Sequence, residues 1–189
     1  MAESMTKEAG PKKNLFSELK SMLVDLKAHC IFWPLAIVGL YFDLWTKHAV
    51  FAKLDDNEAY IVINGYLEFV KRENPGAAWS IFTGRTYLLI TVAAIALVVL
   101  FILFLFSGKQ PRIIQIAMGF FAAGVSGNLY DRIFNDGFVR DFIRVHYKSY
   151  EWPTFNVADS LLCVGVGLLI ISTIFFTEKP SQKHAQTQK

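Results

Sequence analysis

The sequence predicts an all-α membrane protein with four transmembrane helices and a small extramembrane β-sheet in the first outer loop. Of the 189 residues, 53% are hydrophobic and 19% are charged, a balance too apolar for a domain that presents a polar exterior to water. Two stretches, 86–106 and 161–176, contain no Asp, Glu, Lys or Arg. Stretches of this kind suit helices that cross the roughly 30 Å hydrocarbon core of a bilayer.

Each predicted span is an apolar run that a helix could carry across the membrane. In chain order the spans are 31 to about 50, 86–106, 113 to about 130, and 161–176. The first thirty residues are polar and mixed in charge, so no cleavable signal peptide is evident and we expect the first span to remain as a helix. The absence of an internal repeat argues against a transporter built from duplicated bundles.

The charges in the connections predict the orientation. The short connection 107–112 contains Lys109 and Arg112 and no acid, which places it in the cytoplasm because short loops dominate the positive-inside rule. Both termini are then cytoplasmic. The predicted parts are an N-terminal extension at 1–28, a four-helix domain at 29–177 with outer loops at about 51–85 and 131–154, and a polar tail at 178–189. Apolar spacing within 15–27 predicts an amphipathic helix on the membrane surface.

The two outer loops carry turn signals. Asn64-Gly65 separates two apolar runs at 60–63 and 66–70, which predicts a β-hairpin with a type I′ turn. Asp136-Gly137 predicts another turn in the second outer loop. The apolar positions of 138–142 that follow it are expected to dock at the membrane surface.

Several function classes are disfavoured by composition. The formal net charge of +3 is spread along the chain, without the basic stripe of a nucleic-acid-binding protein. Cys30 and Cys163 show no metal-binding or disulfide spacing and are expected to be packing residues. The four histidines are not part of a zinc-peptidase motif, and no serine-hydrolase motif or phosphate-binding loop is present.

Polar residues in or beside three spans all fall on the predicted outer side. They are Asp43 and Lys47 in the first span, Asn128, Asp131 and Arg132 at the end of the third, and Asn156 and Asp159 at the start of the fourth. Ionisable groups inside a membrane are costly and therefore candidates for function. Their convergence predicts an outward-facing polar cavity.

Structural explanations remain open for most of these residues. Asp43 and Lys47 have the i, i+4 spacing of a helix ion pair. Arg132 shares a helix face with Asn128 and could anchor the helix end. Asn156 has the position of an N-cap with Asp159 in the first turn, although an aspartate that enters the membrane with its helix favours a function.

Two aspartates in a site with little water share a proton and titrate as a pair. One then acts as a base on a water molecule and the other as an acid on a peptide carbonyl. Such chemistry needs neither a metal nor another cofactor. Asp141, flanked by Val139 and Phe142 in the second outer loop, would be an ordinary solvated acid unless the fold brings it a partner.

Five segments resemble the motifs of the lipoprotein signal peptidases, also called signal peptidase II. In chain order, 43–47 (DLWTK) is similar to D-x-x-S/T-K, 74–80 (NPGAAWS) to N-x-G-A-A-F-S, 127–132 (GNLYDR) to G-N-x-x-D-R, 139–142 (VRDF) to V-x-D-F, and 155–160 (FNVADS) to F-N-x-A-D-S. The resemblance covers about residues 31–177. Trp79 replaces the usual Phe, and Arg140 occupies a position that is more often apolar, so both are expected to affect substrate fit.

The resemblance implies an aspartic endopeptidase with Asp141 and Asp159 as the catalytic pair. Residues implied to bind substrate or support the site are Asp43, Lys47, Asn74, Gly76, Asn128, Asp131, Arg132, Asn156 and Ala158. The implied substrates are diacylglyceryl-modified prolipoproteins, cut on the N-terminal side of the lipidated cysteine, and globomycin-type inhibitors would occupy the same groove. No oligomer is required.

The implied location is the bacterial cytoplasmic (inner) membrane, with several passes and the active site toward the outer, periplasmic face. Two other functions remain open from the residues alone. A proton-coupled transporter could use the same carboxylates as a relay, and a non-catalytic scaffold would use them only to pair with Lys47 and Arg132. Because every polar motif lies on one side, the pattern favours a peptidase over a transporter.

Overall fold

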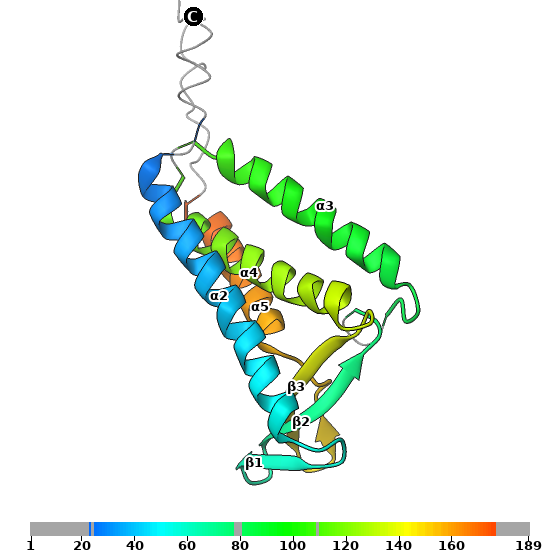
Figure 1. The fold of residues 1–189 in the computed structure, drawn as a ribbon. Helices are drawn as coiled ribbons and strands as arrows, with labels where there is room; N and C mark the ends of the chain where they lie inside the picture. The colour runs from blue at the N-terminus through cyan, green and yellow to red at the C-terminus, as the bar shows by residue number, and fades with distance from the viewer. Residues whose placement is uncertain (1–22, 24, 78–80, 109, 177–189) are drawn as a thin grey trace, which may run out of the picture.

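The computed structural model describes residues 23, 25–77, 81–108 and 110–176. The predicted tail at 178–189 lies outside the described residues. So does most of the extension predicted at 1–28, including nearly all of the expected surface helix at 15–27. The described part consists of four long helices with a small sheet at one end of the bundle (Figure 1).

All four helices are long and apolar enough to cross a membrane, which confirms the predicted number of spans. Their bounds are α2 Leu26–Lys53, α3 Thr86–Leu105, α4 Arg112–Phe134 and α5 Val157–Phe176. The Asp25 carboxylate caps α2 by accepting a hydrogen bond from Ala28 N at 2.9 Å. The helices extend past several predicted limits, so Asp131 lies within α4 and Asp159 within the first turn of α5.

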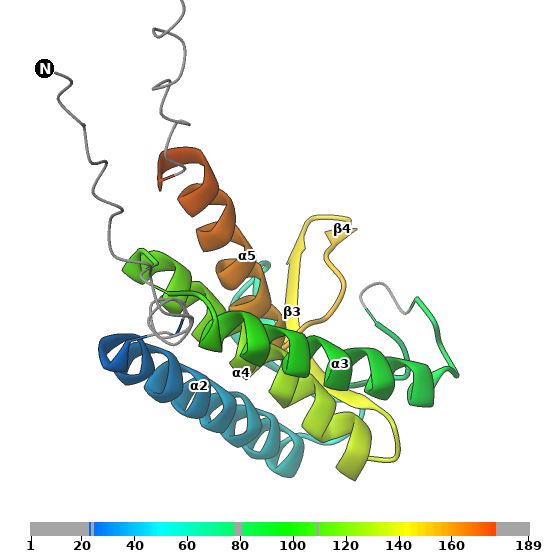
Figure 2. The ribbon, with the colours of Figure 1, turned by 90° about the horizontal axis from the view of Figure 1, so that it is seen from above.

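Helix α4 is the centre of the bundle, since it packs against α2, α3 and α5. Figure 1 shows α4 between α2 and α3, and Figure 2 shows α5 pointing away from them at a steep angle. Small residues permit the close approach. A Cβ atom added at Gly124, for example, would lie 2.6 Å from the Ala158 carbonyl oxygen of α5.

The sheet contains four antiparallel strands in the order β1-β2-β3-β4. Their bounds are β1 Ala59–Ile63, β2 Leu67–Asn74, β3 Val139–Tyr147 and β4 Tyr150–Glu151. The predicted hairpin of the first outer loop is therefore confirmed, but the sheet also takes two strands from the second. The segment 138–142 is not a free apolar surface, because Val139 and Phe142 of β3 are each only 2% exposed.

The predicted type I′ turn is wrong. Such a turn needs a positive φ at both central residues, whereas within the Asn64-Gly65 pair only Gly65 has one, at 77°. Tyr66 N donates to Ile63 O at 3.0 Å across the turn. A positive φ at the second central residue alone is the pattern of a type II turn.

The apolar core lies at the end of the bundle away from the sheet. It is built around Phe32 and Phe104, whose rings stack with centroids 4.0 Å apart, together with Met118 and Ala122. Cys30 and Cys163 do not contribute, because both are free and exposed on the helix surfaces. The expectation that they are packing residues is therefore wrong. The interior at the sheet end contains buried polar and charged side chains as well as apolar ones.

Candidate active site

Strand β3 and the start of α5 bring two distant aspartates together. Phe155, just before α5, pairs with Ile143 of β3: Ile143 N donates to Phe155 O at 2.8 Å, and Phe155 N donates to Ile143 O at 3.1 Å. This pairing places the first turn of α5, with Asp159, beside the part of β3 that carries Asp141. Asp141 thus has the partner that its position in the sequence did not reveal.

Asn156 connects the two aspartates directly. Its Nδ2 donates to Asp141 Oδ1 at 2.7 Å, and its Oδ1 accepts from the backbone N of Asp159 at 2.9 Å. Its own backbone N donates to Asp159 Oδ2 at 3.2 Å. These reciprocal bonds form a capping box, which confirms Asn156 as the N-cap. The fully buried side chain of Asn156 therefore both caps α5 and binds Asp141.

Asp141 is buried, and the side chains that donate hydrogen bonds to it are uncharged amides. Its side chain accepts from Asn74 Nδ2 at 3.0 Å as well as from Asn156, and the residue is only 3% exposed. Burial, and next the negative charge of Asp159, raise the pKa of Asp141 to about 7. At neutral pH this carboxyl group can therefore hold or release a proton.

Asp159 is held by Asn128 of α4. Asn128 Nδ2 donates to Asp159 Oδ1 at 2.8 Å. The Asn128 Oδ1 accepts from Lys47 Nζ and from Asn156 Nδ2, each at 3.1 Å. One amide thus joins the aspartates to the ammonium group of α2.

A buried ion-pair network lies behind this amide. Lys47 Nζ lies 2.7 Å from Asp43 Oδ2 and 3.2 Å from Asp131 Oδ2, and all three side chains are 0% exposed. The structural explanation of Asp43 and Lys47 as an i, i+4 pair is confirmed. Asp43 Oδ1 also accepts from the backbone N of Ala158 at 2.8 Å, which ties α2 to the start of α5.

Arg132 holds the loop that follows β2. Its Nη2 donates to Gly76 O at 2.7 Å, and its Nη1 donates to Asn128 O at 3.2 Å. Gly76 N in turn donates to Asn74 Oδ1 at 2.9 Å. Arg132 is thus half-buried within the site and is not simply an anchor among headgroups. Its Nε is buried without a hydrogen-bond partner among the described residues.

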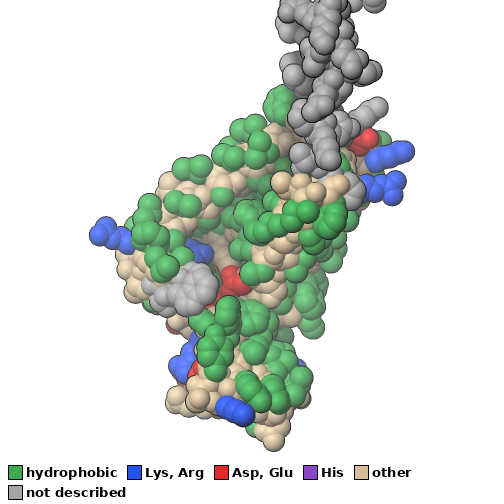
Figure 3. All heavy atoms as spheres, turned by 180° about the vertical axis from the view of Figure 1, so that it is seen from behind, with side chains coloured by type: hydrophobic (Ala, Val, Ile, Leu, Met, Phe, Trp, Pro, Cys, Tyr) green, Lys and Arg blue, Asp and Glu red, His purple; other side chains and the backbone are tan. Residues whose placement is uncertain are grey.

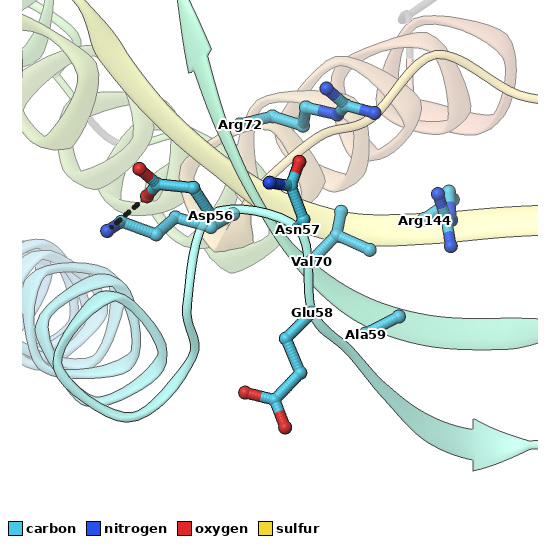
Figure 4. Close-up of a pocket in the computed structure, with 8 residues that line it drawn as sticks. Asp56, Asn57, Glu58, Ala59, Val70, Arg72 and Arg144 are labelled. Carbon is cyan, nitrogen blue, oxygen red and sulfur yellow. Dashed lines mark ion pairs between the residues drawn. The ribbon is translucent and has the colours of Figure 1, made fainter.

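The surface near the site is hollowed. Figure 3 shows acidic side-chain atoms in a recess of an otherwise largely apolar face. A separate polar pocket lies on the sheet and is lined by residues of β1, β2, β3 and the segment before β1 (Figure 4). It contains the 2.7 Å ion pair between Lys71 and Asp56. Neither Asp141 nor Asp159 lines it.

All the predicted site residues lie at the sheet end of the bundle, in contact with at least one other member. Three further contributors were not predicted as site residues. Arg140 pairs with Asp131, and the Ala77 carbonyl lies 3.5 Å from Asn74 Nδ2. A Cβ at Gly127 would lie 2.3 Å from Asp43 Oδ2. The sequence carried a signal for each of them: Arg140 is a charged residue next to Asp141, and Ala77 and Gly127 lie within segments that resemble family motifs.

The arrangement can perform acid–base chemistry with two carboxylates. Among the described residues no group of three or more His, Cys, Asp or Glu could hold a metal ion. Four spanning helices and a polar, aspartate-containing site at one end of them define a polytopic membrane protein equipped for hydrolysis.

The comparisons with known proteins identify the family. The family model described as signal peptidase (SPase) II matches residues 35–175, and the chain belongs to this family. It is a bacterial-type membrane peptidase that removes signal peptides from lipoproteins. This function excludes the transporter and scaffold alternatives as the primary role.

Two relatives show the extent of the similarity. The lipoprotein signal peptidase of Clostridium novyi (strain NT) is 38% identical over 136 residues, covering 71% of this chain and 91% of the relative. That of Cellvibrio japonicus (strain Ueda107) is 38% identical over 156 residues, covering 79% and 90%.

Solved structures agree with the fold. One bacterial membrane enzyme superposes with a TM-score of 0.75 at 28% identity, covering 88% of this chain and 99% of the other. Another gives 0.71 at 29% identity, with 83% and 99% covered. The four-helix arrangement with its sheet is thus a known bacterial membrane-enzyme architecture.

Proposed function

We propose that the chain is an aspartic endopeptidase in which Asp141 and Asp159 form the catalytic dyad. The observation that carries the proposal is Asn156, which hydrogen-bonds to both residues and holds them in one site, with Asp141 buried and Asp159 partly exposed. The proposed substrates are diacylglyceryl-modified prolipoproteins. The scissile bond is the peptide bond on the N-terminal side of the lipidated cysteine.

In the proposed reaction the dyad shares one proton at neutral pH, and Asp141 carries it. The raised pKa of Asp141 supports this assignment. The Asp159 carboxylate takes a proton from a water molecule, whose oxygen attacks the carbonyl carbon of the scissile bond. Asp141 protonates the carbonyl oxygen. When the C–N bond breaks, Asp159 passes its proton to the leaving amine, and a hydroxyl group of the tetrahedral intermediate returns its proton to Asp141, which restores the dyad.

The neighbouring side chains position the dyad and the substrate. Asn74, Asn128 and Asn156 orient the two carboxylates with neutral amides, which leave the dyad proton free to move. Arg132 and Gly76 hold the loop after β2 beside the site.

Deeper in the site, Asp43, Lys47, Asp131 and Ala158 support this arrangement. We place the dyad on the outer side of the cytoplasmic membrane and both termini in the cytoplasm, as the cations of the connection 107–112 indicate. Globomycin-type inhibitors would compete with substrate in the same recess. One chain contains every proposed residue, so an oligomer is not required.

The test follows cleavage of a purified diacylglyceryl-prolipoprotein by gel shift in detergent. Asp141→Asn and Asp159→Asn are compared with the intact chain at equal folded amounts. Asp136→Asn, an exposed aspartate on the same loop as β3, is the matched control. Cleavage by the intact chain and the control alone supports the dyad, whereas cleavage by both dyad variants would refute it. Globomycin should block the intact chain.

A further inference from the structure

We propose that Arg140 is a positioning residue: together its backbone and its guanidinium clamp Asp131, and this clamp fixes the start of β3, and so Asp141, against α4. The inference rests on the proposed dyad and extends it to a residue at a motif position that is more often apolar. We define the Asp131–Arg140 clamp as the three hydrogen bonds between these two residues.

The geometry of the clamp involves both oxygens of one carboxylate. Arg140 N donates to Asp131 Oδ2 at 3.0 Å. The guanidinium Nε and Nη2 donate to Asp131 Oδ1 at 3.1 and 2.6 Å. The Asp131 side chain is 0% exposed and that of Arg140 is 17% exposed. An apolar side chain at this position would remove both donors to Oδ1.

The clamp is connected to Asp141 through the two backbone polar groups of Arg140, its N–H and its carbonyl oxygen. On one side, Arg140 N is bound to Asp131 of α4. On the other, Arg140 O accepts from Asn156 Nδ2 at 3.4 Å, and the same nitrogen donates to Asp141 Oδ1 at 2.7 Å. Both polar backbone groups of the residue before Asp141 are therefore engaged. Small displacements of reacting groups are costly in rate.

The charge of Arg140 also balances the buried ion-pair network. Lys47 is shared between the carboxylates of Asp43 and Asp131. Arg140 adds a second cation, so the four side chains together are neutral. Without it the network would hold an excess negative charge in a buried site. The dyad carboxylates nearby would feel that charge.

The test measures kcat and KM for a diacylglyceryl-prolipoprotein with the full chain in detergent. We expect Arg140→Gln to lower kcat about tenfold with little change in KM, and Arg140→Lys to lower it only about threefold, because Lys restores the charge without the forked donors. Arg144→Gln is the matched control. It removes an arginine of the same strand that pairs with Glu68 and should leave kcat and KM unchanged.

The pH profile of kcat separates positioning from simple stability. Arg140→Gln should move the profile to higher pH, because a buried negative charge left uncompensated raises the pKa of nearby carboxyl groups. The charged groups around Asp141 in this comparison are Asp159 of α5, Lys47 of α2 with its partners Asp43 and Asp131, Arg132 of α4, and Arg72 of β2, the cross-strand neighbour of Asp141. Arg140→Lys should keep the wild-type profile.

Several outcomes would overturn the clamp. One is a kcat for Arg140→Gln equal to that of Arg144→Gln; another is an equal loss in Arg140→Gln and Arg140→Lys with an unmoved pH profile. If Arg140→Gln does not fold, the test rests on Arg140→Lys, and an unchanged kcat in that variant would refute the proposal.

Asp141→Asn and Asp159→Asn are assayed beside the Arg140 variants. Activity in those two variants refutes the dyad itself, whereas their inactivity with normal Arg140 variants refutes only the clamp.

Discussion

At the scale of single residues, Asp141 and Asp159 have neutral hydrogen-bond partners, whereas the aspartates behind them have charged ones. The dyad oxygens accept hydrogen bonds from the amides of Asn74, Asn128 and Asn156. The cations Lys47 and Arg140 instead contact Asp43 and Asp131. A cation in direct contact would favour full ionisation of a catalytic carboxyl. Amides orient the proposed dyad without that effect, which supports the proposal that it shares a proton near neutral pH.

The raised pKa of Asp141 predicts how stability depends on pH. Because it lies at about 7, above the ordinary value, ionising Asp141 costs folding free energy. The cost is absent below the ordinary pKa, grows as pH rises, and is complete above pH ~7. Asp141→Asn cannot ionise, so its unfolding temperature should rise relative to wild type between about pH 5 and about pH 8. Thermal unfolding in detergent measures this, with Asp136→Asn as control, and a parallel pH dependence of wild type and Asp141→Asn would contradict it.

The Asn128 side chain contacts Asp159, Lys47 and Asn156, and its loss should reduce the rate. Asn128→Ala removes the donor to Asp159 and the acceptor for Lys47. We expect kcat to fall roughly 10- to 100-fold, because the dyad is no longer held in one geometry. Steady-state cleavage of the prolipoprotein provides the measurement. Asn57→Ala, at an exposed asparagine before β1, should retain full activity, and equal rates in the two variants would argue against the role of Asn128.

At the scale of elements, the sequence predicted those features that depend on contacts between residues close together in the chain. The cap at Asn156 and the pair of Asp43 with Lys47 could be predicted because their partners are three and four residues apart. The position of Asp141 could not be worked out in this way. It depends on the pairing of β3 with β2 and with Phe155, contacts between segments far apart in the chain. Only the family resemblance indicated its partner beforehand.

For the same reason the sequence did not predict the partner of Arg140 or the strands of the second outer loop. A charged residue beside Asp141 gives no indication that its partner is Asp131, because the turn at Asp136-Gly137 must first reverse the chain. The second outer loop also lacks a strong hairpin signal. In β3 the buried residues Val139 and Asp141 alternate with the partly exposed Arg140, so a charged residue occupies the buried face of the strand. Asp141 is buried because it is part of the site, and an alternating apolar pattern could not have predicted this.

The crossing of α4 with α2 depends on Gly127, which gives a prediction for stability. A Cβ there would lie 2.3 Å from Asp43 Oδ2 and 3.3 Å from Ala158 Cβ. Gly127→Ala should therefore lower the free energy of unfolding by about 1–3 kcal/mol through overpacking and reduce cleavage. Gly167→Ala is the matched control, because a Cβ at Gly167 of α5 meets nothing within 4 Å. Thermal unfolding that is equal in the two variants would contradict the proposed close contact.

At the scale of the whole molecule, the two ends of the bundle have opposite characters. One end is closed by Phe32 and Phe104, and Phe104 is the only buried residue of α3 within the described part of the chain. The other end holds the buried charges and the sheet. Helix α3 packs mainly against α4. This division places the polar site at one membrane face and leaves the other face to apolar packing.

The orientation of the bundle in the membrane gives the last prediction. Cys30 and Cys163 are replaced by Ala, since both are exposed, and single cysteines are placed at Asn57 near the sheet or at Gln110 between α3 and α4. Because the cations of the α3–α4 connection favour the cytoplasm, an impermeant maleimide should label Asn57→Cys in intact spheroplasts. Gln110→Cys should be labelled only after lysis. The reverse pattern would place the dyad in the cytoplasm, on the side opposite to prolipoproteins that have crossed the membrane, and would refute the proposed orientation while leaving the geometry of the site intact.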